Sequence, residues 1–385
     1  MTVAGTGTIP VMRPWLGREE AEAAAAAVAS GWVAQGPRVA ELERAVAARV
    51  GAADGVAVSS CTTALHLALV VLGVGPGDEV VVPSFSFVAT ANVVRYVGAT
   101  PVFADVEPTT GNLAPGTIEP VLSPRTRAVI LVHQGGVPAD VDAVRGLCAP
   151  RGVEIVEDAA CAIGADLGGR PIGAHSDLVA FSFHPRKVIT TGEGGMVMTR
   201  RPEHAARLRR LREHGMSVSA ADRHARREVV LEEYLEVGFN YRMTDIQAAV
   251  GLVQLGRLEA IVERRRSLAA RYRDRLAGVP GLRLVDDPPH GRSNFQSMWA
   301  LLPDDFPVSR DDLLRSLLER GVSARRGIMA SHLEPAYAAT PHVPLPVTER
   351  LTSDSLILPL FHEMTEADQD RVVEALYEVA GALDR

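Results

Sequence analysis

The sequence predicts an α/β protein in which a mostly parallel sheet lies between layers of helices. The chain has 385 residues, which is too long for one small core and suits two unequal lobes. Between Asp78 and Arg200, short β-branched runs alternate with helical stretches. Beyond residue 250 long helices and few strands follow, so we expect a large domain over 1–250 and a smaller C-terminal α+β domain over 251–385.

Six runs between residues 79 and 199 are predicted to be strands of the large sheet. They are continuous apolar segments at 79–83, 101–106, 128–133, 153–158, 178–183 and 195–199. Strands of this kind are buried on both faces, as in a parallel sheet covered by helices on each side. Ligand sites in such sheets lie at the carboxyl ends of the strands, so functional residues are expected where these runs end.

Helical periodicity marks both ends of the chain. The N-terminal segment predicts helices over Gly17–Ser30 and Pro37–Val50, the second with proline in its first turn. A long helix is expected from a cap at Thr244 to about Ala277, bridging the two lobes. The small domain is expected to consist of strands and helices at 281–285, 295–302, 310–320 and 366–383.

Composition excludes several classes of protein. With 47% hydrophobic and 23% charged residues the chain is globular, and a net charge of −7 without a recurring basic block speaks against nucleic acid as a partner. The N-terminus lacks a signal-peptide pattern and the longest apolar run, Leu65–Val74, is too short to span a bilayer, so we expect a cytoplasmic protein without membrane contact. Three cysteines without CxxC spacing predict neither a disulfide framework nor a metal site.

Lys187 is the single lysine of the chain, beside 39 arginines. Arginine can replace lysine wherever only a positive charge is needed, but a guanidinium does not lose its proton and attack a carbonyl. The exception therefore indicates a nucleophilic amine, and a chance survivor on the surface is the alternative.

Polar residues at four strand ends or turns suit an aldehyde cofactor that bears a phosphate and a pyridine ring. A hydroxyl-rich turn, 59–63, opens a helix and can bind an anion, although an ordinary helix cap has the same appearance. Asp158 ends a buried strand, where a carboxylate needs a cationic partner such as a protonated pyridine nitrogen; a helix cap is the alternative. Ser182 ends the next strand and can bind phosphate, and Lys187 follows it in the turn. Phe85 follows the strand at 79–83, where its ring could stack on the pyridine or belong to the core.

These segments resemble the DegT/DnrJ/EryC1/StrS sugar aminotransferases of fold type I, whose large domain has a seven-stranded-type sheet. The resemblance covers nearly the whole chain and includes SCTTALHLAL, EDAACAIGA, FSFHPRKVITTGEGGMV and GFNYRMTDIQ. It implies pyridoxal 5′-phosphate (PLP) as cofactor, with pyridoxamine 5′-phosphate (PMP) as an intermediate. It also implies that Lys187 forms the internal aldimine, that Asp158 pairs with the pyridine nitrogen and that Phe85 stacks on the ring. The protein would be a homodimer with shared sites. The phosphate would be held by Thr62, Thr63, Ser182 and the neighbour's Asn240.

The sequence leaves the roles of four residues open between alternatives. Many relatives carry Gln or His where this chain has Cys161, which would meet the ring hydroxyl of the cofactor; a small buried thiol is the alternative. His184 could contact substrate or be structural. Arg325 and His332 fall where family members often bind substrate, and arginine there would suit a diphosphate or carboxylate; a solvated loop is the alternative.

The resemblance predicts transfer of an amino group from an amino acid, L-glutamate, to the ketone of a nucleotide-linked deoxysugar. A cyclitol or another cyclic ketone of antibiotic biosynthesis is an alternative acceptor that the sequence does not separate from it. A PLP-dependent sugar dehydratase is disfavoured because its relatives carry His in place of Lys187. A non-enzymatic regulator is also disfavoured, because it would not need the full set of cofactor residues that this chain carries.

Overall fold

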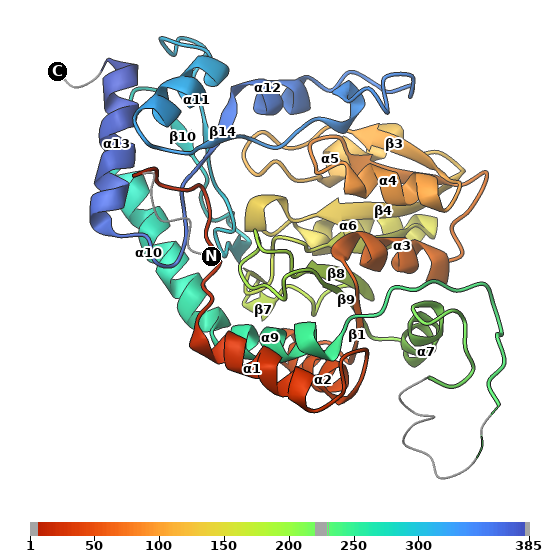
Figure 1. Cartoon of the computed structure of the whole chain (residues 1–385). Coiled ribbons are helices and arrows are strands. Elements are labelled where there is room, and N and C mark those ends of the chain that lie inside the picture. The colour runs from red at the N-terminus through yellow and green to blue at the C-terminus, as the bar shows by residue number, and fades with distance from the viewer. Residues whose placement is uncertain (1–6, 220–228, 230, 382–385) are drawn as a thin grey trace.

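The computed structural model of the chain describes residues 7–219, 229 and 231–381. At its centre lies a seven-stranded sheet with strand order β1-β9-β8-β5-β4-β2-β3 (Figure 1). The strands are β1 (Asp54–Val58), β2 (Glu79–Pro83), β3 (Thr100–Ala104), β4 (Thr126–Val132), β5 (Glu154–Asp158), β8 (Leu178–Ser182) and β9 (Gly195–Thr199). Only β9 runs against its neighbours, so the predicted mostly parallel sheet is confirmed.

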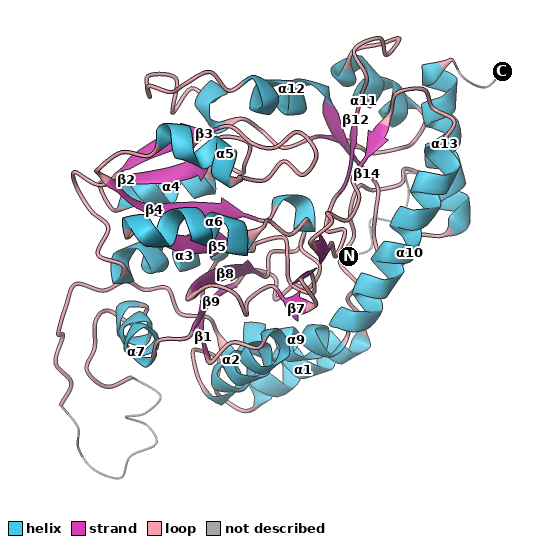
Figure 2. Ribbon diagram, turned by 180° about the vertical axis from the view of Figure 1, so that it is seen from behind, coloured by secondary structure: helices cyan, strands magenta, loops and turns pink. Residues whose placement is uncertain are grey.

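Helices cover both faces of this sheet because its strands present apolar side chains on both faces (Figure 2). In β2, Val80 and Val82 belong to one apolar cluster and Val81 belongs to the other. One face is covered by α3 (Cys61–Val71), α4 (Ala89–Tyr96) and α7 (Pro202–Leu211), and the other by α2 (Pro37–Val50) and α6 (Val141–Cys148). α5 (Pro115–Ile118) is a single short turn.

The two N-terminal helices lie close to their predicted bounds. α1 (Arg18–Ala29) follows an extended Gly17, and α2 begins at Pro37. α2 ends at Gly51, whose φ of 70° is left-handed and therefore suits glycine. Both helices pack against α9 (Asp245–Gly256).

The predicted long helix from Thr244 to about Ala277 is wrong in one respect, because it is two helices. α9 ends at Gly256 and α10 (Leu258–Leu276) begins after Arg257. Arg257 forms ion pairs of 2.9 Å with Glu19 and Glu20 of α1, and its guanidinium lies 4.6 Å from the ring centroid of Trp15. These contacts stabilise the interruption between α9 and α10, which lies next to Gly256, a residue type that weakens helices.

The C-terminal part forms a second, smaller α+β unit beyond α10 (Figure 1). Its sheet has the order β10-β12-β14-β13, with β10 (Arg283–Leu284), β12 (Met298–Leu301), β14 (Ser355–Leu358) and β13 (Arg325–Arg326). Its helices are α11 (Arg310–Glu319), α12 (Pro346–Asp354) and α13 (Glu366–Ala380). The expected boundary at 250/251 falls inside α9, and we propose Arg257 as the boundary instead.

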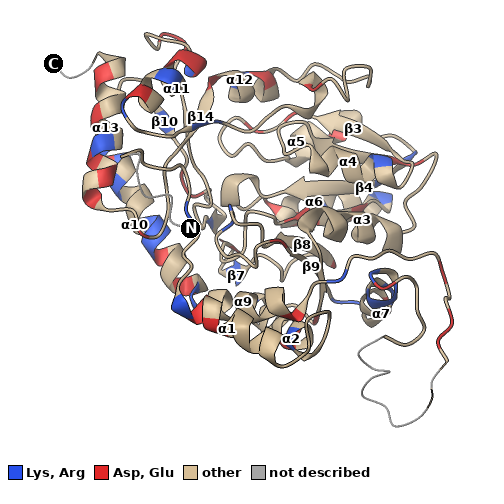
Figure 3. Cartoon of the chain, viewed as in Figure 1, with Lys and Arg blue, Asp and Glu red and all other residues tan. Residues whose placement is uncertain are grey.

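Two smaller features join the units. The segment around Ile9 pairs with the C-terminal part, where Ile9 N–H donates to Gly321 O at 2.8 Å. β11 (Gly291–Arg292) pairs with β6 (Asp166–Leu167), which also pairs with β7 (Arg170–Pro171). Charged side chains gather on the outer helices such as α10 and α13, whereas the central strands carry few (Figure 3). None of the helices that the structure describes is long and apolar enough to cross a membrane.

Candidate active site

The predicted site residues gather at one edge of the large sheet. Asp158 ends β5 and Ser182 ends the neighbouring β8. Ser59 follows β1, which runs parallel to them, and Gly195 begins the antiparallel β9 at the same edge. The carboxyl ends of parallel strands therefore bring these turns together, as the sequence predicts.

Asp158 carries a buried carboxylate whose loss of hydration is only partly compensated by its neighbours. It is 6% exposed; Thr90 Oγ1 donates to its Oδ2 at 3.0 Å, and Ala160 N–H donates to Oδ1 at 3.2 Å. Burial raises the pKa of Asp158, and the two donors together with the charge of Lys187 offset this only in part. A cationic group bound beside Asp158 would supply the missing compensation.

Lys187 lies half-buried in the turn after β8. Its Nζ donates to Cys161 Sγ at 3.2 Å. Burial opposes the charge of this amine, but Cys161, Cys61 and Asp158 together outweigh burial and raise the pKa of Lys187. The single ε-amine of the chain thus faces the turn that follows Asp158.

The start of α3 offers free hydroxyls at a helix N-terminus. Ser60 Oγ accepts from Thr63 N–H at 3.2 Å and Thr63 Oγ1 accepts from Ser60 N–H at 3.1 Å, so Thr63 serves the helix cap. Thr62, by contrast, uses its hydroxyl in no hydrogen bond with another described residue. Among the residues that the structure describes, Ser182 Oγ accepts only a long bond of 3.4 Å from His184 N–H. Hydroxyls of Thr62 and Ser182 therefore remain available to an anion at the positive end of α3.

Gly195 allows β9 to pass directly against this turn. A Cβ at position 195 would lie 2.5 Å from the backbone nitrogen of Cys61 and would also meet the backbone of Ser60. Only glycine permits such an approach, which explains the glycine at position 195.

Phe85, predicted to stack on a cofactor ring, is instead a core residue. It is 3% exposed, and a Cβ on Gly111 would lie 3.0 Å from its ring. Its neighbour Phe87 is 57% exposed. Ser86 and Thr90, which flank Phe87, are joined by a 2.8 Å hydrogen bond, and Thr90 in turn contacts Asp158. This arrangement corrects the expectation for Phe85, because the available ring is that of Phe87.

Both histidines named from the sequence have hydrogen-bonding neighbours, His184 within its own turn and His332 in the distant turn after β2. His184 Nδ1 accepts from Arg186 N–H at 3.1 Å, which shapes the turn before Lys187, and Nε2 lies 3.7 Å from Glu193. Burial lowers the pKa of His184 and Glu193 partly opposes this. His332 is 4% exposed, with Nδ1 2.6 Å from Ser84 Oγ, so it fastens the turn after β2 and is not on a solvated loop.

Arginines gather near Lys187. Arg325 is exposed on β13; desolvation and the charges of Arg186 and Arg326 lower its pKa. Within the described part of the chain, neither Arg186 nor Arg325 has an acidic partner, whereas Arg326 lies 3.7 Å from Glu334. The guanidinium groups of Arg186 and Arg325 are therefore available to an anion.

Asn240 is exposed and forms an isolated bridge with Glu213. The next residue, Tyr241, accepts from Ser59 N–H at 2.8 Å through its carbonyl oxygen. Asn240 therefore lies beside the turn before α3, with its side chain at the surface.

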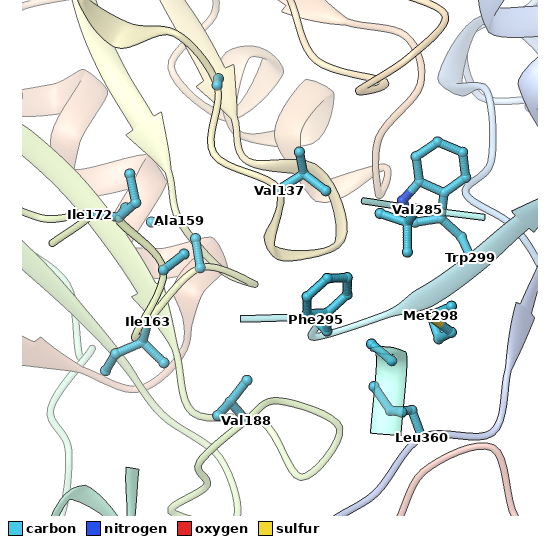
Figure 4. Packing of buried hydrophobic residues seen from close by; sticks show 14 of the residues in the cluster. Val137, Ala159, Ile163, Ile172, Val188, Val285, Phe295, Met298, Trp299 and Leu360 are labelled. Carbon is cyan, nitrogen blue, oxygen red and sulfur yellow. The ribbon is translucent and has the colours of Figure 1, made fainter. Parts of the chain in front are cut away.

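A turn at 294–296 braces the loops that carry Lys187 and Cys161. Asn294 Nδ2 donates to the carbonyl oxygens of Cys161 and Ile163, both at 2.8 Å, and Gln296 Nε2 donates to that of Arg186 at 2.6 Å. Arg265 of α10, 2% exposed, holds the turn by donating to the carbonyl oxygens of Phe295 at 2.9 Å and Gln296 at 2.7 Å. Phe295, with a left-handed φ of 49°, packs among buried apolar residues such as Val137 and Val188 (Figure 4).

Sequence reasoning missed this brace, Thr90 and Phe87. The repeated Phe of PSFSF indicated an aromatic at this edge but not which ring is free. Nothing in the local pattern around 294–296 marks a contact with residues more than a hundred positions away.

The residues present fit PLP. Asp158 lacks a full cationic partner, the single amine lies in the adjacent turn, and the free hydroxyls of Thr62 and Ser182 lie at the neighbouring strand ends. Among the described residues, no group of three His, Cys, Asp or Glu side chains could hold a metal ion.

Comparison with known proteins agrees with this geometry. The model of the DegT/DnrJ/EryC1/StrS aminotransferase family matches residues 14–377. The aminotransferase TlmJ from Streptoalloteichus hindustanus is 38% identical, with a TM-score of 0.90 over 98% of this chain and 100% of that one. DesI, solved in the presence of its TDP-sugar product, is 34% identical, with a TM-score of 0.87 over 98% and 94%. The putative sugar aminotransferase Spr1654 from Streptococcus pneumoniae, in its PMP form, is 26% identical, with a TM-score of 0.91 over 97% and 99%.

Proposed function

The chain belongs to the DegT/DnrJ/EryC1/StrS aminotransferase family and is a PLP-dependent aminotransferase, and on that premise we propose that it transfers the amino group of L-glutamate to a keto group of a nucleotide-linked deoxysugar. The contact that carries this proposal is Lys187 Nζ at 3.2 Å from Cys161, in the turn beside the buried carboxylate of Asp158. The sugar acceptor is supported by DesI and its TDP-sugar product.

Five residues of this chain would hold the cofactor. When bound, PLP supplies an aldehyde that links covalently to an amine and a ring that accepts electrons. Lys187 supplies the amine, and Asp158 keeps the ring nitrogen protonated because its buried carboxylate favours a neighbouring cation. Thr62 and Ser182 bind the phosphate at the N-terminus of α3. Phe87 covers the ring with its exposed aromatic face.

Lys187 is also the group that moves protons. Its Nζ, once neutral and not linked to the cofactor, can accept a proton and return it to another atom. His184 is less suited to this task because both of its ring nitrogens have neighbours in the turn.

Substrate recognition is assigned to the arginines near the site. Arg325 and Arg186, which have no acidic partner among the described residues, would bind the diphosphate of the acceptor or a carboxylate of the donor. His332 would act indirectly, since its ring is buried against Ser84. We assign the chain to a homodimer in which Asn240, exposed beside the turn before α3, contacts the phosphate bound by the partner subunit.

A product assay tests the acceptor. Purified enzyme with PLP and L-glutamate is offered a panel of TDP-linked keto-deoxysugars and, in parallel, cyclic ketones including cyclitol ketones, with products read by mass spectrometry. We expect an aminated nucleotide sugar, and none with Lys187→Ala. Amination of a cyclitol ketone alone would replace the sugar assignment, and no amination of any ketone would contradict the proposal.

A further inference from the structure

Cys161 is built into a fixed contact with Lys187. Cys161 follows β5 and Lys187 follows β8, and these strands are neighbours, so the two turns lie side by side. The distance from Lys187 Nζ to Cys161 Sγ is 3.2 Å, and this is the one side-chain hydrogen bond of Lys187 in the described part of the chain.

Both turns are held from the same side. Asn294 bonds the carbonyl oxygen of Cys161 itself, and Gln296 bonds that of Arg186, the residue before Lys187. Gln296 N–H also donates to Asn294 Oδ1 at 2.8 Å, which ties the two braces to each other. The backbones of both turns are therefore held by one segment, which limits how far the sulfur and the amine can move apart.

The sulfur of Cys161 lies among cations. Lys187 contacts it directly, and the buried guanidinium of Arg265 interacts with it electrostatically. Burial lowers the pKa of Arg265 to about 10, and Cys161 opposes this, just as it opposes the effect of burial on Lys187. A sulfur at this position thus favours the charged amine even where solvent is scarce.

We propose that Cys161 is a positioning residue for Lys187: its sulfur accepts a hydrogen bond from Nζ and holds the amine in place whenever Lys187 is not linked to the cofactor. The contact itself is independent of the reaction, whereas its consequence for turnover rests on the proposed function. Cys161 thereby determines the position of the free amine of Lys187 and the affinity of that amine for a proton.

Because Lys187 is the single lysine of the chain, its contact with Cys161 can be measured without an activity assay. The full-length apoenzyme is treated with an amine-acylating reagent across a pH series, and the rate at the peptide containing Lys187 is read by mass spectrometry. In Cys161→Ala the amine should become neutral at lower pH, so that below the midpoint Lys187 is labelled about threefold faster or more than in the wild type, a change of about half a pH unit in its titration. Cys161→Ser, which keeps an acceptor, should recover part of the wild-type profile. Cys148→Ala, at a buried cysteine on α6, is the control and should leave the profile unchanged.

The PLP-loaded enzyme gives the second readout. With L-glutamate, Cys161→Ala should slow the change in cofactor absorbance about threefold or more, because the released amine is no longer held in place, and should leave the KM for glutamate unchanged. Cys161→Ser should lie between the two. Identical Lys187 labelling profiles for wild type, Cys161→Ala and Cys161→Ser would overturn the positioning role. A shifted profile in a protein that aminates no ketone would support the positioning role and contradict the proposed function.

Discussion

Phe85 and Phe87 should respond in opposite ways to truncation. Phe85 is 3% exposed, so Phe85→Ala should lower the free energy of unfolding by about 3 to 5 kcal/mol. Phe87 is 57% exposed, so Phe87→Ala should change that free energy by no more than about 0.5 kcal/mol. If Phe87 covers the cofactor ring, loss of stacking worth about 0.5 to 1.5 kcal/mol should weaken PLP binding about two- to tenfold.

Guanidinium unfolding of the apoenzyme, followed by circular dichroism, measures the first quantity, and titration of the apoenzyme with PLP measures the second. Phe85→Leu provides a milder core change if Phe85→Ala does not fold, and Phe87→Tyr is a control that keeps an aromatic ring and should bind PLP as the wild type does. Normal PLP binding by Phe87→Ala, together with loss of affinity in a Phe85→Leu variant that is folded at the temperature of the assay, would exclude Phe87 as the residue that covers the cofactor ring.

Four further outcomes are expected. Lys187→Arg should retain a positive charge but form no borohydride-reducible link to PLP, and a reducible link in that variant would contradict the assignment. Asp158→Asn should reduce turnover far more than cofactor occupancy, since the phosphate contacts remain; near-normal turnover would exclude Asp158 as partner of the ring nitrogen. Mixing Lys187→Ala with Asn240→Ala should restore activity above the sum of the parents once subunits exchange, and no gain would place Asn240 in its own chain's site or in none. Gly195→Ala should weaken PLP binding by displacing the turn at Ser60, as read by the same titration.

The central sheet could be predicted because its signal is local. β2 spans Glu79–Pro83 and β9 spans Gly195–Thr199, as expected. Every residue in these two strands is buried, and runs of apolar or β-branched residues in the sequence indicate such burial. Asp158, Ser182 and Lys187 could be placed together because parallel strands put their carboxyl ends at one edge.

Features that depend on distant contacts could not be predicted. The break at Arg257 is held by Glu19 and Glu20 of α1, which no periodicity within the helix reports. The choice between Phe85 and Phe87 depends on the path of the turn after β2, where Ser86 bonds Thr90 and Thr90 bonds Asp158.

Arg265 also determines which parts of the site can shift as a unit. Because α10 holds the turn at 294–296, and that turn holds both loops, a small rotation of α10 would carry Lys187 and Cys161 along together. Asp158 is anchored separately, by the ladder of β5 and by Thr90. Movement of the C-terminal unit, as would follow from the proposed binding of an acceptor to Arg325, would therefore shift the turns that carry the amine and the sulfur together, relative to the carboxylate of Asp158.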